Sequence, residues 1–336
     1  MLSPGFDKTE ARELLEICAK LNSTRVEGDP SFREVIDTPT MPSPPIPSPA
    51  VPKPEKWEQV YALDETKTPD HNYFEIWKST EVPNRYTLGV RGTTQAIGSI
   101  IEDVRALSLP ATSKEGNFHI HRPYRLASDP RATVHIGFTL GMMSIIDEVV
   151  TQMQHFSSGE GPHEWFITGH SQGAAVATLC RSYLHYQPLP GVENITYKTY
   201  VFAQPKPGDT YYGYDFERIN FDYSKQSSVA FRVSNTYDWV TEVPLSIQLL
   251  KDLSRPNLLT VHNPFKLGKK GLNSLIHPIL VLLEKVRFLT SLDYVGCGVP
   301  IILPGVEGEN TEDENDFFWQ HHTGMYYKLL LEQFGT

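Results

Sequence analysis

Hydrophobic residues along the chain recur in two patterns, short apolar runs typical of strands and three- or four-residue spacing typical of amphipathic helices. Strands are predicted at residues 73–78, 86–91, 165–167, 197–202 and 229–234, with a last strand or hairpin at 292–303. Helices are predicted at residues 7–21, 96–109, 134–156, 272–289 and 317–334. Alternating strands and helices predict an α/β fold, with a mostly parallel sheet covered by helices on both faces.

A proline-rich stretch interrupts this pattern near the N-terminus. Its sequence, TPTMPSPPIPSPAVPKP, favours an extended strap across the surface over a ligand for a PxxP-binding module. We therefore divide the chain into an N-terminal helical extension (1–37), the strap or linker (38–55) and one α/β domain (56–336). The single helix of the extension cannot form a core of its own, so we expect it to dock on the main domain.

Composition narrows the possible functions. The chain has 336 residues, of which 40% are hydrophobic and 21% charged, which is ordinary for a globular protein with a sizeable core. Its net charge of −10 argues against a nucleic-acid partner. The three cysteines are too few and too scattered for a disulfide framework or a zinc site. Neither a secretory signal nor a membrane-spanning run is apparent, so we expect a cytoplasmic protein or one secreted by another route.

The stretch EWFITGHSQGAAVA, residues 164–177, carries the clearest chemical signal. Gly169, Ser171 and Gly173 form a G-x-S-x-G motif between an apolar strand and an alanine-rich helix, which is the context of a nucleophile elbow. The helix that starts there directs its N–H groups toward the serine, where negative charge would develop. We therefore predict that Ser171 is a nucleophile.

A serine nucleophile needs a histidine base and a carboxylate that orients this base. In enzymes built on this elbow, the order along the chain is serine, acid, histidine. Asp238 directly follows the strand at 229–234 and is the preferred acid. Asp209 and Asp215 follow earlier strands and remain alternatives.

Four histidines follow Asp238 in the sequence: His262, His277, His321 and His322. The first lies in an irregular stretch and the second inside a helix pattern. The last two lie between the last strand and the last helix, where a loop-borne base is expected. Adjacent side chains point in different directions, so only one of these two can face the serine.

Two backbone positions are candidates for an oxyanion hole. The N–H group of Gln172, the residue after the nucleophile, is one expected donor. Thr93 follows the strand at 86–91 and can donate from its N–H and its hydroxyl group.

From residue 57 to the C-terminus, the chain resembles the class 3 lipases, the filamentous-fungal type of triacylglycerol lipase. The resemblance rests on five motifs in order: LGVRGT, VHIGF, GHSQGAA, FAQPKPGD and NTYDWVTEVP. It implies an α/β-hydrolase fold in which Ser171 is the nucleophile, Asp238 the acid, and Thr93 with Gln172 the oxyanion hole. The last motif, HHTGMYY, fits the family with either histidine, and we choose His322 as the base.

The resemblance also implies a function. We expect a serine-dependent lipase that forms an acyl-enzyme at Ser171, needs no metal or organic cofactor, and acts on lipid esters at an oil–water or membrane interface. The predicted helix 96–109 is the candidate for an amphipathic lid. Alternatives are a phospholipase, an esterase for feruloyl-type or other soluble esters, and an inactive hydrolase fold that serves as a binding module. The sequence indicates no protein partner.

Overall fold

The computed structural model describes residues 2–23, 50–64, 66, 68, 72–91, 108–116, 120–244, 293–306 and 319–335. Three of the predictions lie wholly or mostly outside these residues: the lid helix up to residue 107, the helix at 272–289 and most of the proline-rich strap. Among the described helices, none is long and apolar enough to cross a membrane.

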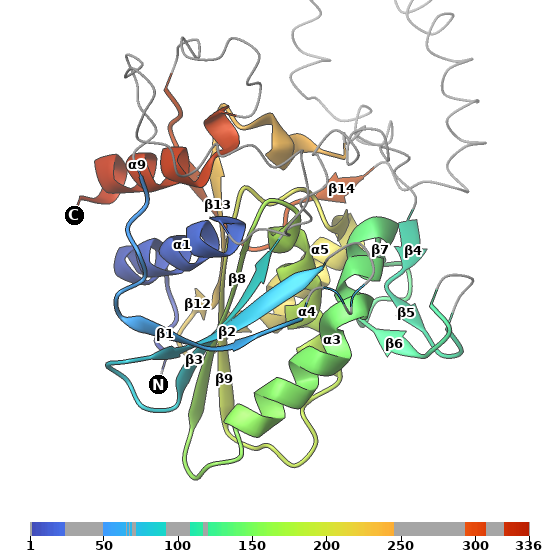
Figure 1. Ribbon diagram of the computed structural model, residues 1–336. Helices are drawn as coiled ribbons and strands as arrows, with labels where there is room; N and C mark the ends of the chain where they lie inside the picture. The colour runs from blue at the N-terminus through green and yellow to red at the C-terminus, as the bar shows by residue number, and fades with distance from the viewer. Residues whose placement is uncertain are drawn as a thin grey trace, which may run out of the picture.

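A seven-stranded sheet forms the centre of the described structure (Figure 1). Its strands, in spatial order, are β1 (Trp57–Ala62), β2 (Tyr73–Ser79), β3 (Arg85–Arg91), β8 (His163–His170), β9 (Ile195–Phe202), β13 (Ala230–Asn235) and β15 (Val299–Leu303). The five strands from β3 to β15 are parallel, and β1 and β2 add an antiparallel edge. The predicted mostly parallel sheet is confirmed, although β1 was not predicted.

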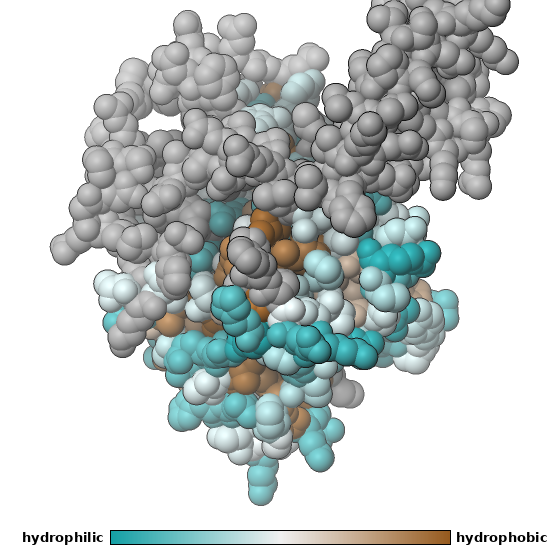
Figure 2. Space-filling view, turned by 90° about the vertical axis from the view of Figure 1, so that its right-hand side faces the viewer, coloured by the Kyte–Doolittle hydropathy of each residue, from teal (hydrophilic) through white to brown (hydrophobic). Residues whose placement is uncertain are grey.

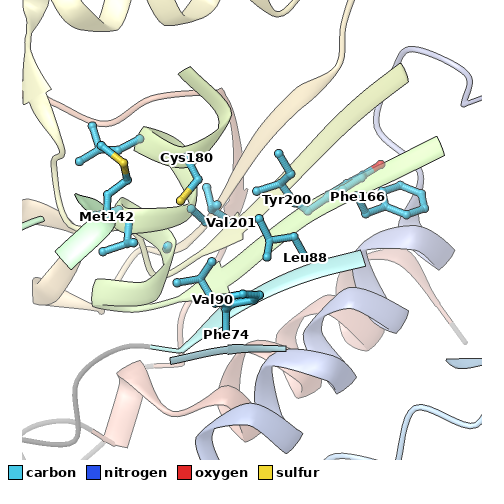
Figure 3. Close-up of a cluster of buried hydrophobic side chains, with 14 of the residues drawn as sticks. Phe74, Leu88, Val90, Met142, Phe166, Cys180, Tyr200 and Val201 are labelled. Carbon is cyan, nitrogen blue, oxygen red and sulfur yellow. The ribbon is translucent and has the colours of Figure 1, made fainter. Parts of the chain in front are cut away.

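Helices cover both faces of this sheet (Figure 1). One face carries α1 (Lys8–Ser23) and α9 (Thr323–Phe334), and the other carries α3 (Ile136–Phe156), α4 (Gln172–Tyr186) and α5 (Thr210–Ile219). Figure 3 shows part of the core, with Leu88 and Val90 of β3, Val201 of β9, Met142 of α3 and Cys180 of α4 among the labelled side chains. The outer surface on the α3 side carries a band of hydrophilic residues with smaller hydrophobic areas above and below it (Figure 2).

The N-terminal helix α1 is part of the same hydrophobic core. Its apolar stripe, including Leu14 and Leu21, is fully buried. The approach to the sheet is close, because a Cβ atom at Gly89 of β3 would lie 2.6 Å from Leu21 Cδ1. Glu10 of α1 also accepts hydrogen bonds from buried Lys198 and, at 2.7 Å, from the hydroxyl of Tyr200. Packing and a largely buried ion pair therefore hold α1 against β9.

Short strands build a second sheet beside the main one. They are β14 (Tyr294–Val295), β10 (Gly208–Asp209), β7 (Thr133–His135) and β4 (Ser108–Pro110). Two predicted helix boundaries are corrected here. Residues 133–135 form a strand, so α3 begins at Ile136, where the side chain of His135 caps it by accepting from Gly137 N–H at 3.2 Å. Residues 108–110 pair with β7 and are extended where a helix was predicted.

The remaining short elements connect these layers. They are β5 (Thr112–Ser113), β6 (Tyr124–Arg125), β11 (Phe221–Asp222), β12 (Ser227–Ser228), and the 3-10 helices η3 (Trp239–Glu242) and η4 (Trp319–His321). The first of these 3-10 helices, η3, follows β13, and the second, η4, precedes α9. They therefore lie in the two connections from which the acid and the base were expected.

Candidate active site

Ser171 lies in the tight turn between β8 and α4. Its backbone has φ +59° and ψ −133°, a conformation that is costly for a residue with a side chain. The turn is held by two hydrogen bonds, from Ser171 N–H to Phe202 O at 3.0 Å and from Ala174 N–H to Ser171 O at 2.9 Å. A Cβ atom at Gly169 would lie 2.4 Å from the carbonyl oxygen of Gly173, so only glycine fits at that position. The geometry is that of a strained elbow presenting a serine.

Asp238 follows β13 and occupies the N-cap position of η3. Its Oδ1 accepts a hydrogen bond from Val240 N–H at 3.0 Å. Its Oδ2 accepts two more, from His321 Nδ1 at 2.8 Å and from the Tyr326 hydroxyl at 2.7 Å. The residue is only 3% exposed. The carboxylate is therefore buried, fully engaged, and paired with one histidine.

These contacts decide the charge of Asp238. Burial alone would raise the pKa of this carboxyl group, because it removes water from the charged form. The nearby His321 and the hydrogen bonds from His321, Tyr326 and Val240 act in the opposite direction and outweigh burial. The pKa of Asp238 is consequently lower than usual, and the side chain is an anion at neutral pH.

The structure pairs Asp238 with His321 and not with His322, the histidine chosen from the sequence. His321 is the last residue of η4 and is 3% exposed. His322 occupies the N-cap position of α9 and is only partly buried. The reason for the difference is local: the chain turns from η4 into α9 at this point, so the two adjacent side chains leave it in different directions, and His321 is the one that reaches Asp238.

His170, the residue before the serine, holds the loop of His321 in place. Its Nε2 lies 2.8 Å from the backbone oxygen of His321 and must be the protonated nitrogen, because a carbonyl oxygen can only accept. Its Nδ1 then accepts from the amide of Asn22 in α1 at 3.3 Å. The two histidine rings lie 4.7 Å apart between centroids. His321 is thereby fixed beside the elbow by a histidine of the elbow itself.

This arrangement keeps the His170 ring neutral. Burial, more than any other influence, lowers its pKa to about 3. Both ring nitrogens already have the partners that suit the neutral form, one as a donor and one as an acceptor. A proton added at Nδ1 would face the Asn22 amide, itself placed as a donor.

A second set of hydrogen bonds supports the pair from behind. The amide group of Asn235 donates to the backbone oxygen and to the side-chain oxygen of Gln320, each at 2.8 Å. The backbone N–H of Asn235 donates to the Tyr326 hydroxyl at 3.1 Å, and this hydroxyl donates to Asp238. The sequence interpretation did not assign a role to Asn235 or Tyr326. Their signal was present, however, as the asparagine of NTYD and an aromatic residue of HHTGMYY.

The two alternative acids have structural roles. Asp209 caps α5 by accepting from Tyr212 N–H at 2.9 Å, and it also accepts from the backbone and hydroxyl of Thr133. Asp215 accepts from Ser128, Tyr186 and Arg218. Neither contacts a histidine through these bonds, which leaves Asp238 as the carboxylate paired with a histidine in the described structure.

Of the two predicted oxyanion donors, only Gln172 lies among the described residues. Gln172 is the first residue of α4, so its N–H lies at the start of that helix beside Ser171. Thr93 lies outside the described residues, as do His262 and His277. The described strand β3 ends two residues before Thr93, and its Val90 lies opposite Gly169 of the elbow strand. The chain therefore leaves β3 next to the elbow.

The described residues contain no group of three or more histidine, cysteine, aspartate or glutamate side chains arranged to hold a metal ion. What the site does contain is a hydroxyl on a strained turn and a buried carboxylate–histidine pair. These are the parts required for nucleophilic attack by an activated serine.

Comparison with known proteins gives related results. Residues 87–247 match the family model described as Lipase (class 3). The chain is 26% identical over 157 residues to a secreted mono- and diacylglycerol lipase, LIP4, of Malassezia restricta, a match that covers 47% of this chain and 46% of the relative. The chain thus spans about half the length of the curated relatives it matches. Among solved structures, M37 lipase has a TM-score of 0.54 at 16% identity, covering 81% of this chain and 78% of that one, which supports the α/β-hydrolase fold.

Proposed function

We propose, from the match of residues 87–247 to the class 3 lipase family, that the protein is a serine-dependent hydrolase of lipid esters. One observation carries the proposal: a buried Asp238–His321 pair tied through His170 to a strained Ser171. A binding module would have no need of this costly turn or of a buried carboxylate hydrogen-bonded to a histidine.

In the proposed reaction, His321 takes the proton of Ser171 as the serine oxygen attacks the ester carbonyl. Asp238 holds the Nδ1 proton of His321, which directs the other ring nitrogen to the reaction and stabilises the imidazolium. The tetrahedral oxyanion accepts hydrogen bonds from Gln172 N–H and from Thr93.

Collapse of this intermediate breaks the bond to the alcohol, which leaves with the proton from His321, and Ser171 remains acylated. Water then attacks the acyl-enzyme with His321 again as base, and the carboxylic acid is released. The base proposed here is His321, in place of the His322 chosen from sequence.

The substrate class follows from the relatives. The curated relative in Malassezia restricta is named for mono- and diacylglycerols, and we propose acylglycerols as substrates of this chain too. Phospholipids and soluble esters use the same catalytic groups and are the alternatives for the test to decide. The action at an oil–water interface and a lid at residues 96–109 remain predictions.

The test is hydrolysis of p-nitrophenyl esters of increasing acyl length by the wild type and by three variants. We expect Ser171→Ala and His321→Ala to lower kcat by about three orders of magnitude or more, because each removes a member of the proposed triad. His322→Ala is the matched control, since it removes the adjacent imidazole and should change kcat by no more than a few-fold.

The outcomes separate the alternatives. Preference for long acyl chains, followed by release of fatty acid from diacylglycerol emulsions, supports the lipase proposal. Activity on short chains alone would replace it with a soluble esterase, and release of fatty acid from phosphatidylcholine with a phospholipase. A Ser171→Ala protein that keeps the wild-type rate would overturn the mechanism altogether.

A further inference from the structure

A cavity lies at the end of the sheet opposite to Ser171. It has a volume of about 510 Å³, within the roughly 300–1,000 Å³ typical of small-molecule sites. Its walls come from the second half of α4, the start of β9 and the turn before β13, and they include Arg181, Leu184, Ile195, Tyr197, Lys225 and Val229.

The register of the sheet separates this cavity from the elbow. Ile195, in the wall of the cavity, lies opposite His163, the first residue of β8, whereas Ser171 follows the last residue of that strand. Eight residues of extended chain correspond to a separation on the order of 25 Å. The cavity is therefore distinct from the candidate active site.

Arg181 is the unusual residue of this cavity. It is 5% exposed, yet its Nε and Nη1 atoms have no hydrogen-bond partner among the described residues. No carboxylate of the described chain forms an ion pair with it. Its guanidinium group lies over the ring of Tyr197, with 4.9 Å between the guanidinium carbon and the ring centroid. A buried guanidinium with unpaired N–H groups is energetically costly, and an anion bound in the cavity that Arg181 lines would offset part of that cost.

The charges around Arg181 define which acceptor fits. Lys225 adds a second cation at the exposed rim, while Asp222 adds one carboxylate. His185 lines the cavity as well, and burial, followed by nearby arginines, lowers its pKa, which favours its neutral form. Two cations against one carboxylate leave one net positive charge, which suits a monoanion better than a dianion.

The apolar wall defines the rest of the ligand. Four of the lining side chains are aliphatic, those of Leu2, Leu184, Ile195 and Val229. We propose that this cavity binds an amphiphilic monocarboxylate, with its carboxylate on Arg181 and its hydrocarbon tail against these side chains. The planar guanidinium matches a carboxylate in geometry. Binding rests on the cavity alone, whereas the identification of the ligand with a fatty acid released by the enzyme rests on the proposed function.

The experiment is calorimetric titration of sodium decanoate into the full-length Ser171→Ala protein. We expect Arg181→Met in this background to weaken binding at least about tenfold, because the variant keeps the bulk of the side chain and removes the charged donors. Lys225→Glu, at the exposed rim, should weaken it several-fold. Lys114→Glu makes the same charge change at an exposed site outside the cavity and should leave binding unaltered.

Further probes separate the two halves of the ligand. Acetate has the carboxylate without the tail, decan-1-ol has the tail without the charge, and inorganic phosphate has a different anionic group; each should bind more weakly than decanoate. Decanoate affinity that is the same in the Arg181→Met and Lys225→Glu proteins as in their parent would overturn the proposal, and so would tighter binding of phosphate. If Arg181→Met does not fold, the comparison of Lys225→Glu with Lys114→Glu decides the matter.

Failure of this inference and failure of the proposed function give different results. In one case, decanoate binding depends on Arg181 and Lys225, but the wild type shows no hydrolysis that depends on Ser171. This result supports the proposed binding site and overturns the identification of its ligand with a fatty acid released by the enzyme. Hydrolysis that depends on Ser171, without such binding, overturns the cavity proposal alone.

Discussion

Asp238 and Arg181 are both buried charges, and the protein treats them in opposite ways. Asp238, at the carboxyl edge of the sheet, accepts three hydrogen bonds and faces a histidine. Arg181, near the other end, is similarly buried, but two of its guanidinium nitrogen atoms have no hydrogen-bond partner in the described chain. The hydrogen-bond partners of Asp238 all lie within the protein, and one of them is His321, whose ring it orients. The buried guanidinium of Arg181 lacks such partners and lines a cavity, which is the basis for the ligand proposed above.

Lys198, in strand β9, shows that the fold can pair a buried cation with a carboxylate. It is 1% exposed in its side chain and is paired with Glu10 of α1. It therefore resembles Asp238 in having a partner of opposite charge or a hydrogen-bonding partner within the protein, and Arg181 differs from both.

The largest effect is expected when Asp238, the buried charge with partners inside the protein, is replaced. Asp238→Asn should lower kcat/KM for a p-nitrophenyl ester by about three orders of magnitude or more, because a neutral amide can neither stabilise the imidazolium nor hold the required His321 tautomer. Steady-state kinetics, with circular dichroism to check the fold, measures this effect.

Asp215→Asn is the matched control for that variant. Asp215 is also a buried aspartate with several donors, but it contacts Ser128, Tyr186 and Arg218 instead of a histidine. It should lose stability and keep kcat/KM within a few-fold. Equal losses of kcat/KM in the two variants would contradict the role given to Asp238.

The next prediction concerns His170 and the pH dependence of stability. Its pKa is about 3 in the folded protein and near 6.5 for an ordinary histidine in the unfolded chain, so below pH 6.5 the unfolded chain binds a proton that the folded chain does not. The free energy of unfolding must therefore fall as pH falls from 6.5 toward 3. For this one group, the loss between pH 7 and pH 5 is about 2 kcal/mol.

Urea unfolding of His170→Gln at these two pH values measures the effect. Glutamine can still donate to the His321 carbonyl but does not titrate, so we expect the fall in stability between pH 7 and pH 5 to be about 2 kcal/mol smaller than in the wild type. His155→Gln removes an exposed histidine and should leave the fall unchanged. An unchanged fall in the His170 variant would mean that this ring also takes up its proton in the folded state.

The sequence predicted those features of the site that depend on local chain geometry. The elbow at Ser171 was recognisable because G-x-S-x-G between a strand and a helix admits few other conformations. Asp238 was recognisable because it directly follows a buried strand, and the carboxyl ends of parallel strands meet at one edge. The mostly parallel sheet followed from the alternation of strand and helix patterns.

What the sequence did not predict depends on side-chain direction and tertiary packing. The choice between His321 and His322 depends on how η4 passes into α9, a difference of one residue that no hydrophobic pattern encodes. Strand β1 has polar and apolar residues without clear alternation, and its pairing with β2 defines it. Arg181 gives no local signal, because an arginine within a helix usually faces solvent. Its burial becomes evident only when α4 lies on the sheet.

The smallest effect is expected when Arg181, the buried charge that lacks hydrogen-bond partners for two of its nitrogen atoms, is replaced. Arg181→Met should raise the free energy of unfolding at pH 7 by about 1 kcal/mol, because it removes a buried cation without a partner, and the lost contact with the Tyr197 ring offsets only part of this gain. Burial lowers the pKa of Arg181 to about 10, which has the same physical origin. Urea unfolding with an unchanged m-value measures the difference. Saturating decanoate should then reverse the order, since only the wild type gains stability from binding at this site. A variant at least 1 kcal/mol less stable than the wild type without ligand would mean that the guanidinium already stabilises the fold, and the contrast with Asp238 would disappear.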